Sequence, residues 1–405
     1  MGDMPPPPDS GKVVDIRGET VLGSGTAVWA QREFATRAAD TSAVLVTHGA
    51  HLSLDQISVR KDGDTSSFDA SSFVGMNAAL LANDGASMIL RNAHILATGS
   101  GANGVFAAGK GSNARLEHVE IRATGDNAHG VMVAGGGSMS LDDVSINTSA
   151  QRSAAIATDR GGGVIRVKDG KWRTTGKTSP VLYSTGSLEV NGGEGHAMDS
   201  EAIVIEGSNS VSLSGTRLFG ARNGAMIYQS FSGDAQGQHG SLSMIGGSLT
   251  VASGPAFFVT NASADVALEG CALESASGVF AEARADRWGR KDANGGHLNL
   301  KVRDQTISGV MRTDAISDIS VTLGKGASWN GSSQGRVSVT LEDGARWVLD
   351  ADARIVSLKG ADCASGTCRN IRGKGYVLRY DVQANAWAAG KTFALEGGGE
   401  LRPVR

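Results

Sequence analysis

Acidic side chains lie at or just beyond the ends of short apolar runs in this chain, and their types are those that cleave glycosidic bonds. Asp159 follows the run that begins at Ala155, Glu206 ends the run that begins at Ile203, and Asp234 lies a little beyond a third run. Paired carboxylates can serve as general acid and general base in such cleavage. These three residues are therefore candidate catalytic acids, with no role assigned to any one of them.

Other polar residues near the ends of successive runs could hydrogen-bond an extended ligand. They combine hydroxyl, amide and charged groups, which predicts a polar ladder on one face of the molecule. The predicted binding residues are Arg160, Tyr183, Tyr228, Gln229, Ser230, Asn261 and Glu282. The ladder suits an oligosaccharide, but the same groups could also serve only to hydrogen-bond one another where strands end. Both interpretations stay open.

An internal repeat must position these residues. The apolar runs recur at intervals of 26, 26, 24, 26, 22, 23, 31 and 22 residues, beginning at Ala79, Val105, Val131, Ala155, Val181, Ile203, Met226, Phe257 and Val279. Each run is followed by a segment in which apolar residues alternate with period two, as in a strand with one buried face. A two-residue gap inside that segment reverses the alternation, which indicates a corner between two strands.

Segments of this size hold two or three short strands and leave no room for a helix. We therefore predict an all-β fold, a single right-handed parallel β-helix of about 22–26 residues per turn with capped ends. In that fold Asp159 and Glu206 lie two turns apart, roughly 10 Å along the axis. This separation is near the upper limit for an inverting glycosidase and too long for a retaining one.

The second residue of each run is apolar as well, so both faces of this sheet are expected to be covered. The alignment assigns this outer column to Leu80, Phe106, Met132, Ile156, Leu182, Val204, Ile227, Phe258 and Phe280. An exposed apolar stripe of that length exceeds what monomeric surfaces normally show. The cover is expected to be the chain's own loops or ends, a second copy bound by self-association, or a ligand.

The extent of the repeat predicts the domain boundaries. Residues 1–10, with four consecutive prolines, are interpreted as a spacer, 11–40 as an N-terminal cap, 41–359 as the β-helix and 360–405 as a C-terminal cap. Caps are expected because the last strand of a stack would otherwise expose an unpaired edge.

The three cysteines indicate an oxidising compartment. Cys363 and Cys368 flank a short hydrophilic loop and are predicted to form a disulfide, with two free surface thiols as the alternative, whereas Cys271 falls on a core position. No signal peptide and no membrane-spanning apolar stretch are recognised, so membrane insertion is not expected. The net charge of −3 gives no indication of a nucleic-acid partner.

The repeat pattern resembles the pectate-lyase-like β-helices and the passenger domains of autotransporter adhesins. More narrowly, the stretches ATDRGGG, YSTG, IEG and IYQSxSGDA resemble stand-alone secreted bacterial β-helix proteins, over roughly residues 40–400. The resemblance implies the fold and a secreted, periplasmic or cell-surface location. The Asp clusters that bind calcium in pectate lyases and the Asp motifs of polygalacturonases are not found, so neither a metal nor a cofactor is expected.

These observations favour an adhesin-like secreted or surface protein that binds a polysaccharide, a cell-surface glycan or another surface partner. A polysaccharide-acting enzyme, either a lyase or a glycoside hydrolase that uses the acidic residues above, is one alternative. A structural protein that self-assembles through its apolar outer column is another.

Overall fold

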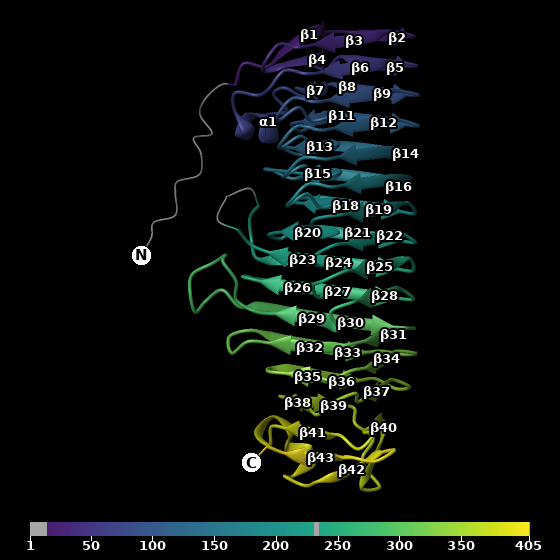
Figure 1. Ribbon diagram of the computed structural model, residues 1–405, viewed down its shortest axis with the longest axis vertical. Helices are drawn as coiled ribbons and strands as arrows, with labels where there is room; N and C mark the ends of the chain where they lie inside the picture. Colours follow the sequence, from purple (N-terminus) through teal and green to yellow (C-terminus); the bar gives the residue numbers. More distant parts are fainter. Residues whose placement is uncertain (1–13, 231–234, 405) are drawn as a thin grey trace. The chain divides into compact units, whose positions relative to one another are not determined.

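Short parallel strands make up most of the chain in a computed structural model, which describes residues 14–230 and 235–404. The chain divides into two compact units, residues 1–221 with 230–237, and residues 222–229 with 238–405. Each unit is a right-handed parallel β-solenoid, and together they contain about 15 turns with 3% of residues in helices. Within each unit, successive turns lie one above the next (Figure 1). The predicted all-β parallel β-helix is confirmed.

Each turn of the first unit contains three strands, and each strand pairs in parallel with its equivalent in the next turn. The first strands are β1 (Arg17–Leu22), β4 (Thr41–Val46), β7 (Leu80–Asn83), β10 (Val105–Ala108), β13 (Val131–Ala134), β15 (Ile156–Thr158), β17 (Leu182–Ser184) and β20 (Ile203–Glu206). The second strands are β2 (Thr26–Ala30), β5 (His51–Asp55), β8 (Ser87–Arg91), β11 (Asn113–Glu117), the first halves of β14 (Gly137–Thr148) and β16 (Gly163–Thr174), β18 (Ser187–Asn191) and β21 (Ser210–Ser214). The third strands are β3 (Glu33–Thr36), β6 (Ser58–Lys61), β9 (His94–Ala97), β12 (Glu120–Ala123), the second halves of β14 and β16, β19 (Glu194–Ala197) and β22 (Arg217–Gly220).

The second unit follows the same plan. Its first strands are β23 (Ala225–Tyr228), β26 (Phe257–Thr260), β29 (Val279–Ala283), β32 (Val310–Thr313) and β35 (Ser333–Gln334). Its second strands are β24 (His239–Ile245), β27 (Ala262–Glu269), β30 (Gly296–Arg303), β33 (Asp318–Leu323), β36 (Val337–Leu341) and β39 (Leu358–Lys359). Its third strands are β25 (Ser248–Val251), β28 (Ala272–Ser275), β31 (Thr306–Ser308), β34 (Ser328–Asn330), β37 (Arg346–Val348) and β40 (Thr367–Arg372).

A sharp corner separates the second strand from the third in each turn of the first unit. The corner residue has a positive φ, for example 50° at Asn92, 54° at His118 and 52° at Asp143. Asn, Asp and His adopt this left-handed conformation more readily than other non-glycine residues. The corner lies at the two-residue gap of the sequence pattern and turns the third strand onto a new face.

A second corner, directly after the third strand, is packed by backbone alone. A Cβ atom on Gly125 would lie 2.0 Å from the carbonyl oxygen of Gly99, and one on Gly99 would lie 2.1 Å from that of Gly63. No side chain fits at such distances. Glycine at these positions therefore allows the turns to stack at strand spacing.

Large side chains fill the interior of each unit. In the first unit, Trp172 is almost fully buried and its indole Nε1 donates to the carbonyl oxygen of Val144 at 3.2 Å. Its partner across the ladder is Gly195, which leaves room for the ring. In the second unit, Trp329 and Trp347 stack with ring centroids 4.6 Å apart. These contacts bury large apolar area in a chain that is otherwise poor in aromatic residues.

The outer side of the first sheet is also apolar in the first unit, and a helix packs on it. Helix α1 (Phe68–Val74) begins at Ser67, whose Oγ accepts a hydrogen bond from the backbone N–H of Ala70 at 3.2 Å. Gly75 ends the helix and lies against Leu81 and Phe106. The repeat pattern leaves no room for a helix within a turn. The structure accommodates α1 as an insertion between β6 and β7 (Figure 1).

The strand register differs by one residue from the sequence alignment at several turns. Val105 pairs with Leu80, so the outer column contains Leu81 in place of Leu80. Likewise, Tyr183 takes the outer position that the alignment assigns to Leu182. The difference arises because three or four consecutive apolar residues carry no alternation that could fix which of them faces outward.

The ends of the chain were expected to be caps. Strands β1, β2 and β3 pair in parallel with β4, β5 and β6, so residues 17–36 form a regular turn of the solenoid. The predicted spacer at residues 1–10 lies outside the described residues. The last residues form β38 (Ala353–Ile355), β41 (Val377–Tyr380), the 3-10 helix η1 (Gln383–Ala388), β42 (Phe393–Glu396) and β43 (Glu400–Pro403).

The C-terminal segment departs from the parallel plan. Strands β42 and β43 pair antiparallel, which ends the parallel stacking within the second unit. Cys363 and Cys368 form the predicted disulfide, and Cys271 is buried as a free thiol, as expected for a core position.

One buried histidine makes the stability of the first unit depend on pH. His129 accepts a hydrogen bond at Nδ1 from the backbone N–H of Ala154 at 3.0 Å, and burial lowers its pKa to about 4 from an ordinary 6.5. The unfolded chain therefore binds more protons than the folded chain between these two values. Stability contributed by the neutral ring is complete above pH 6.5 and is lost as the pH falls towards 4.

We expect the free energy of unfolding to decrease by about 3 kcal/mol over that interval on account of His129. In the variant His129→Gln, an amide that does not titrate replaces the imidazole, and the decrease should be smaller by that amount. Denaturant unfolding of both proteins at a series of pH values measures this difference. Parallel curves for the two proteins would contradict the assignment.

Candidate functional site

Three of the predicted residues meet in the first unit around the carboxylate of Glu206. This side chain, at the end of β20, is only 1% exposed. The Tyr183 hydroxyl donates to its Oε2 at 2.8 Å, and the Ser230 hydroxyl donates to its Oε1. Both carboxylate oxygens therefore accept hydrogen bonds from protein side chains, and solvent hardly reaches them.

Asp159 and Arg160 lie at the end of another first strand of this unit. Asp159 is 8% exposed, and its Oδ1 accepts the backbone N–H of Arg160 at 2.7 Å. The guanidinium of Arg160 lies over the ring of Phe73, 3.8 Å from its centroid, so it packs against α1. Asp234, the third candidate acid, lies outside the described residues.

The other predicted residues belong to the second unit. The Asn261 side chain donates to the carbonyl oxygen of Gln229 at 2.7 Å. The Tyr228 ring packs on Trp288 with centroids 5.6 Å apart, and Glu282 accepts from Arg312 at 2.9 Å. The predicted residues are thus divided between the two units, and their role in binding or catalysis stays a prediction.

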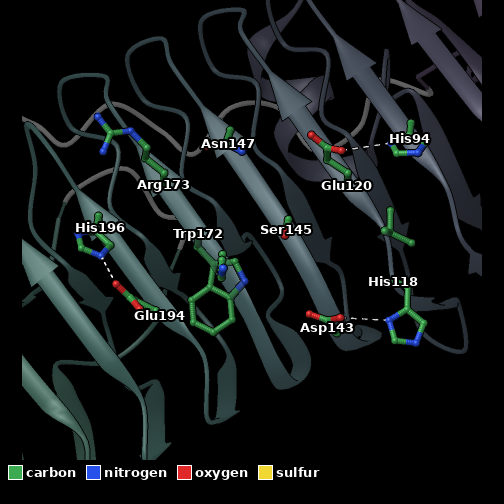
Figure 2. A pocket seen from close by; sticks show the side chains of 12 residues that line it. His94, His118, Glu120, Asp143, Ser145, Asn147, Trp172, Arg173, Glu194 and His196 are labelled. Carbon is green, nitrogen blue, oxygen red and sulfur yellow. Dashed lines mark hydrogen bonds and ion pairs between the residues drawn. The ribbon is translucent and has the colours of Figure 1, made fainter.

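An open groove of about 760 Å³ lies elsewhere, on the outward side of the third strands of the first unit (Figure 2). Strands β9, β12 and β19 and the second halves of β14 and β16 line it. We call the outward side of these strands, together with the neighbouring third strands β3, β6 and β22, the groove face.

Two columns of side chains run along the groove face because the third strands pair in register. The column nearer the corner contains Ser58, His94, Glu120, Ser145, Lys171, Glu194 and Arg217. The column farther from the corner contains Arg60, Leu96, Arg122, Asn147, Arg173, His196 and Phe219. Successive members of a column are one strand spacing apart, about 4.8 Å.

Two acidic groups in the groove, Glu120 and Glu194, have histidine or cationic partners. The Nδ1 atom of His94 lies 3.2 Å from Oε2 of Glu120. The two carboxylate oxygens of Glu194 lie 2.7 Å from Nε2 of His196 and 3.0 Å from Nη2 of Arg217. Hydrogen bonds from His196 and Arg217 hold the pKa of Glu194 below its ordinary range. These pairs are solvent-exposed and add little to stability. Arg217 offsets the charge of Glu194, whereas His94 offsets that of Glu120 only when the imidazole is protonated.

Three cations of the same face have no such partner. Arg122, Lys171 and Arg173 are exposed and make no ion pair with any residue of 14–230 or 235–404. Figure 2 shows Arg173 beside Asn147 on the neighbouring strand, and both side chains are exposed. The groove therefore presents unpaired positive charge beside hydrogen-bonding amide and hydroxyl groups.

Neither a metal cluster nor a membrane helix is found in the part of the chain that the structure describes. Among those residues, no three or more His, Cys, Asp or Glu side chains are grouped so as to hold a metal ion. None of the described helices has the length and apolar character needed to span a bilayer.

The groove face does not follow from the apolar runs, because those runs form the first sheet and the groove lies on the third strands. The outward residues of the alternating segments recur at the same interval, and their alignment is the sequence feature from which the groove face could have been predicted. Aligning these segments on their corner residues, such as His118 and Asp143, brings Arg122, Asn147 and Arg173 into one column.

A parallel β-solenoid whose outer face carries a regular polar groove defines the class of this protein. The chain is similar to the BrkA autotransporter of Bordetella pertussis, with 25% identity over 277 residues. The match covers 58% of this chain and 26% of that protein, so the similarity spans about a quarter of the relative. No family model matches the chain.

The hydrogen bond from Tyr183 to buried Glu206 predicts a measurable effect on stability. In Tyr183→Phe the carboxylate loses one buried donor, which should lower the free energy of unfolding by about 1–3 kcal/mol. Denaturant unfolding measures it. Tyr376→Phe is the matched control, since Tyr376 is exposed. Equal stability of the Tyr183→Phe variant and the unchanged protein would contradict the proposed contact.

Proposed function

We propose that this chain belongs to a secreted or cell-surface β-helix protein that acts as an adhesin-like module. It binds a polysaccharide or cell-surface glycan along the groove face and does not cleave it. The observation that carries the proposal is the pair of in-register columns, which repeat polar and charged groups along an open groove.

The similarity to an autotransporter supports the location. The relative is an autotransporter, and the resemblance of the repeat pattern to autotransporter passenger domains favours the same location. The disulfide between Cys363 and Cys368 is consistent with an oxidising, extracytoplasmic compartment.

The shape of the groove supports a polymeric carbohydrate ligand. The groove is shallow and open, and it runs across several turns instead of closing around a small molecule. Asn147, Ser145 and Lys171 offer donors and acceptors that match sugar hydroxyls, at intervals of about one strand spacing.

The state of the acidic groups supports binding without cleavage. A general acid needs a pKa raised towards neutral pH, whereas the pKa of Glu194 in the groove is lowered. Glu206, the predicted acid with the best-defined contacts, is buried beneath its hydrogen-bond donors. The enzymatic alternative, which uses Asp159, Glu206 and Asp234, therefore gains no support from the described residues.

A glycan array probed with labelled protein tests this proposal. We expect the unchanged chain to bind at least one class of glycan, and the double variant Arg122→Ala/Arg173→Ala to bind it at least about tenfold more weakly. The matched control is Arg166→Ala/Lys168→Ala. It also removes two cations near this part of the solenoid, but from the first half of β16, beyond the corner.

Binding that both double variants lose equally would contradict the assignment to the groove face, and no binding to any glycan would contradict the function. The bound polysaccharides should also be incubated with the protein and assayed for new reducing ends and unsaturated sugars. Release of either product, abolished by Glu206→Gln, would establish the enzymatic alternative instead.

A further inference from the structure

The far column of the groove face alternates arginine with uncharged residues. From β6 to β16 the residues in register are Arg60, Leu96, Arg122, Asn147 and Arg173. Arginine therefore recurs at every second turn, a separation of roughly 9.6 Å at the backbone. This alternation follows from pairing register alone and does not depend on side-chain rotamers.

The groove is continuous along this column. A hollow of about 480 Å³ includes Arg60, Leu96 and Arg122, and one of about 380 Å³ includes Arg122, Asn147 and Arg173. The 760 Å³ groove described above shares Asn147 and Arg173 and continues to His196. Because adjoining hollows share their lining residues, one linear ligand can contact all of them.

The arginines differ in how far their charge is already neutralised. Arg60 donates from Nε to Asp62 at 2.7 Å. Arg122 and Arg173 have no ion pair among the described residues, and Asn147 lies between them. Guanidinium groups bind carboxylates and sulfates through paired hydrogen bonds, so these two arginines are the anion anchors of the column.

An apolar platform adjoins the second anchor. His196 follows Arg173 in the column, and its ring stacks on Phe219 with centroids 5.9 Å apart. Aromatic faces pack against the C–H faces of pyranose rings, and both residues are half-buried, so part of each side chain is accessible to solvent. A sugar bound next to Arg173 can therefore stack on this platform.

The spacing of the anchors sets the charge density of the ligand. A nucleic-acid strand carries one phosphate per 3.4 Å of helix axis, about three for each arginine interval of roughly 9.6 Å. An extended chain of pyranoses advances by about one turn spacing per sugar, so an acid on every second sugar matches the arginine interval.

We propose that the groove face binds a linear acidic polysaccharide in which uronic acids alternate with neutral sugars, an inference that rests on the proposed function. The chain lies along the solenoid axis, with successive carboxylates on Arg122 and Arg173 and the intervening sugar opposite Asn147. A neutral sugar beyond Arg173 stacks on His196 and Phe219.

Binding of a long hyaluronan oligosaccharide, in which glucuronate alternates with an N-acetylated sugar, tests this proposal by biolayer interferometry. Arg122→Ala and Arg173→Ala should each raise its Kd at least about tenfold. The control Arg166→Ala/Lys168→Ala should leave Kd within about twofold, and added salt should weaken binding by the unchanged protein. Hyaluronan binding that is insensitive to both groove substitutions would overturn the proposal.

The variant Asn147→Arg tests the spacing itself. It places arginine on three successive turns, at an exposed position where the longer side chain can be accommodated. Its affinity for polygalacturonate, which carries a carboxylate on every sugar, should rise relative to its affinity for hyaluronan by at least about fivefold. An unchanged ratio of the two affinities would show that arginine spacing does not select the ligand.

The remaining outcomes separate this inference from the proposed function. If the chain binds only neutral glycans through the groove face, the proposed function holds and this inference fails. Tighter binding of oligo-dT than of hyaluronan, with the same loss in Arg122→Ala, would identify a nucleic-acid surface and overturn both. Absence of binding to any glycan would overturn both as well.

Discussion

In-register pairing of parallel strands between successive turns is the interaction on which the rest of the structure depends. It sets one spacing, about 4.8 Å, for every column of side chains, inside and outside the coil. Gly99 and Gly125 permit that spacing at one corner, and left-handed residues such as Asn92 and His118 form the other. Once the turns are stacked, a residue's position in its turn decides whether it lies in the core or on the groove face.

The repeat pattern was sufficient to predict the fold, because period-two alternation and the two-residue corner are local features. Register in the first sheet was not predictable, since runs such as Leu80, Leu81 and Ala82 are buried on both sides and lack alternation. Helix α1 could not be inferred either, because it is an insertion whose role, covering Leu81 and Phe106, appears only once the outer column is placed.

The candidate sites, like the fold, could be predicted only in part from the sequence. Glu206 and Tyr183 were identified by residue type, but their type did not reveal that they hydrogen-bond to each other in a buried position. Arg122, Asn147 and Arg173 were overlooked because each is an ordinary exposed residue of an alternating strand. Their significance comes from alignment across turns, which requires the correct register. A polar residue near the apolar runs is therefore a weaker indication of binding than an exposed column with unpaired charge.

The most direct test of the central claim is hydrogen–deuterium exchange of the chain with and without bound hyaluronan. Binding along the groove face predicts that added protection is confined to β9, β12 and β19, the second halves of β14 and β16, and the adjoining corners. Protection at β17 and β20, around Tyr183 and Glu206, would contradict it. So would bound hyaluronan that leaves exchange on the groove face unchanged.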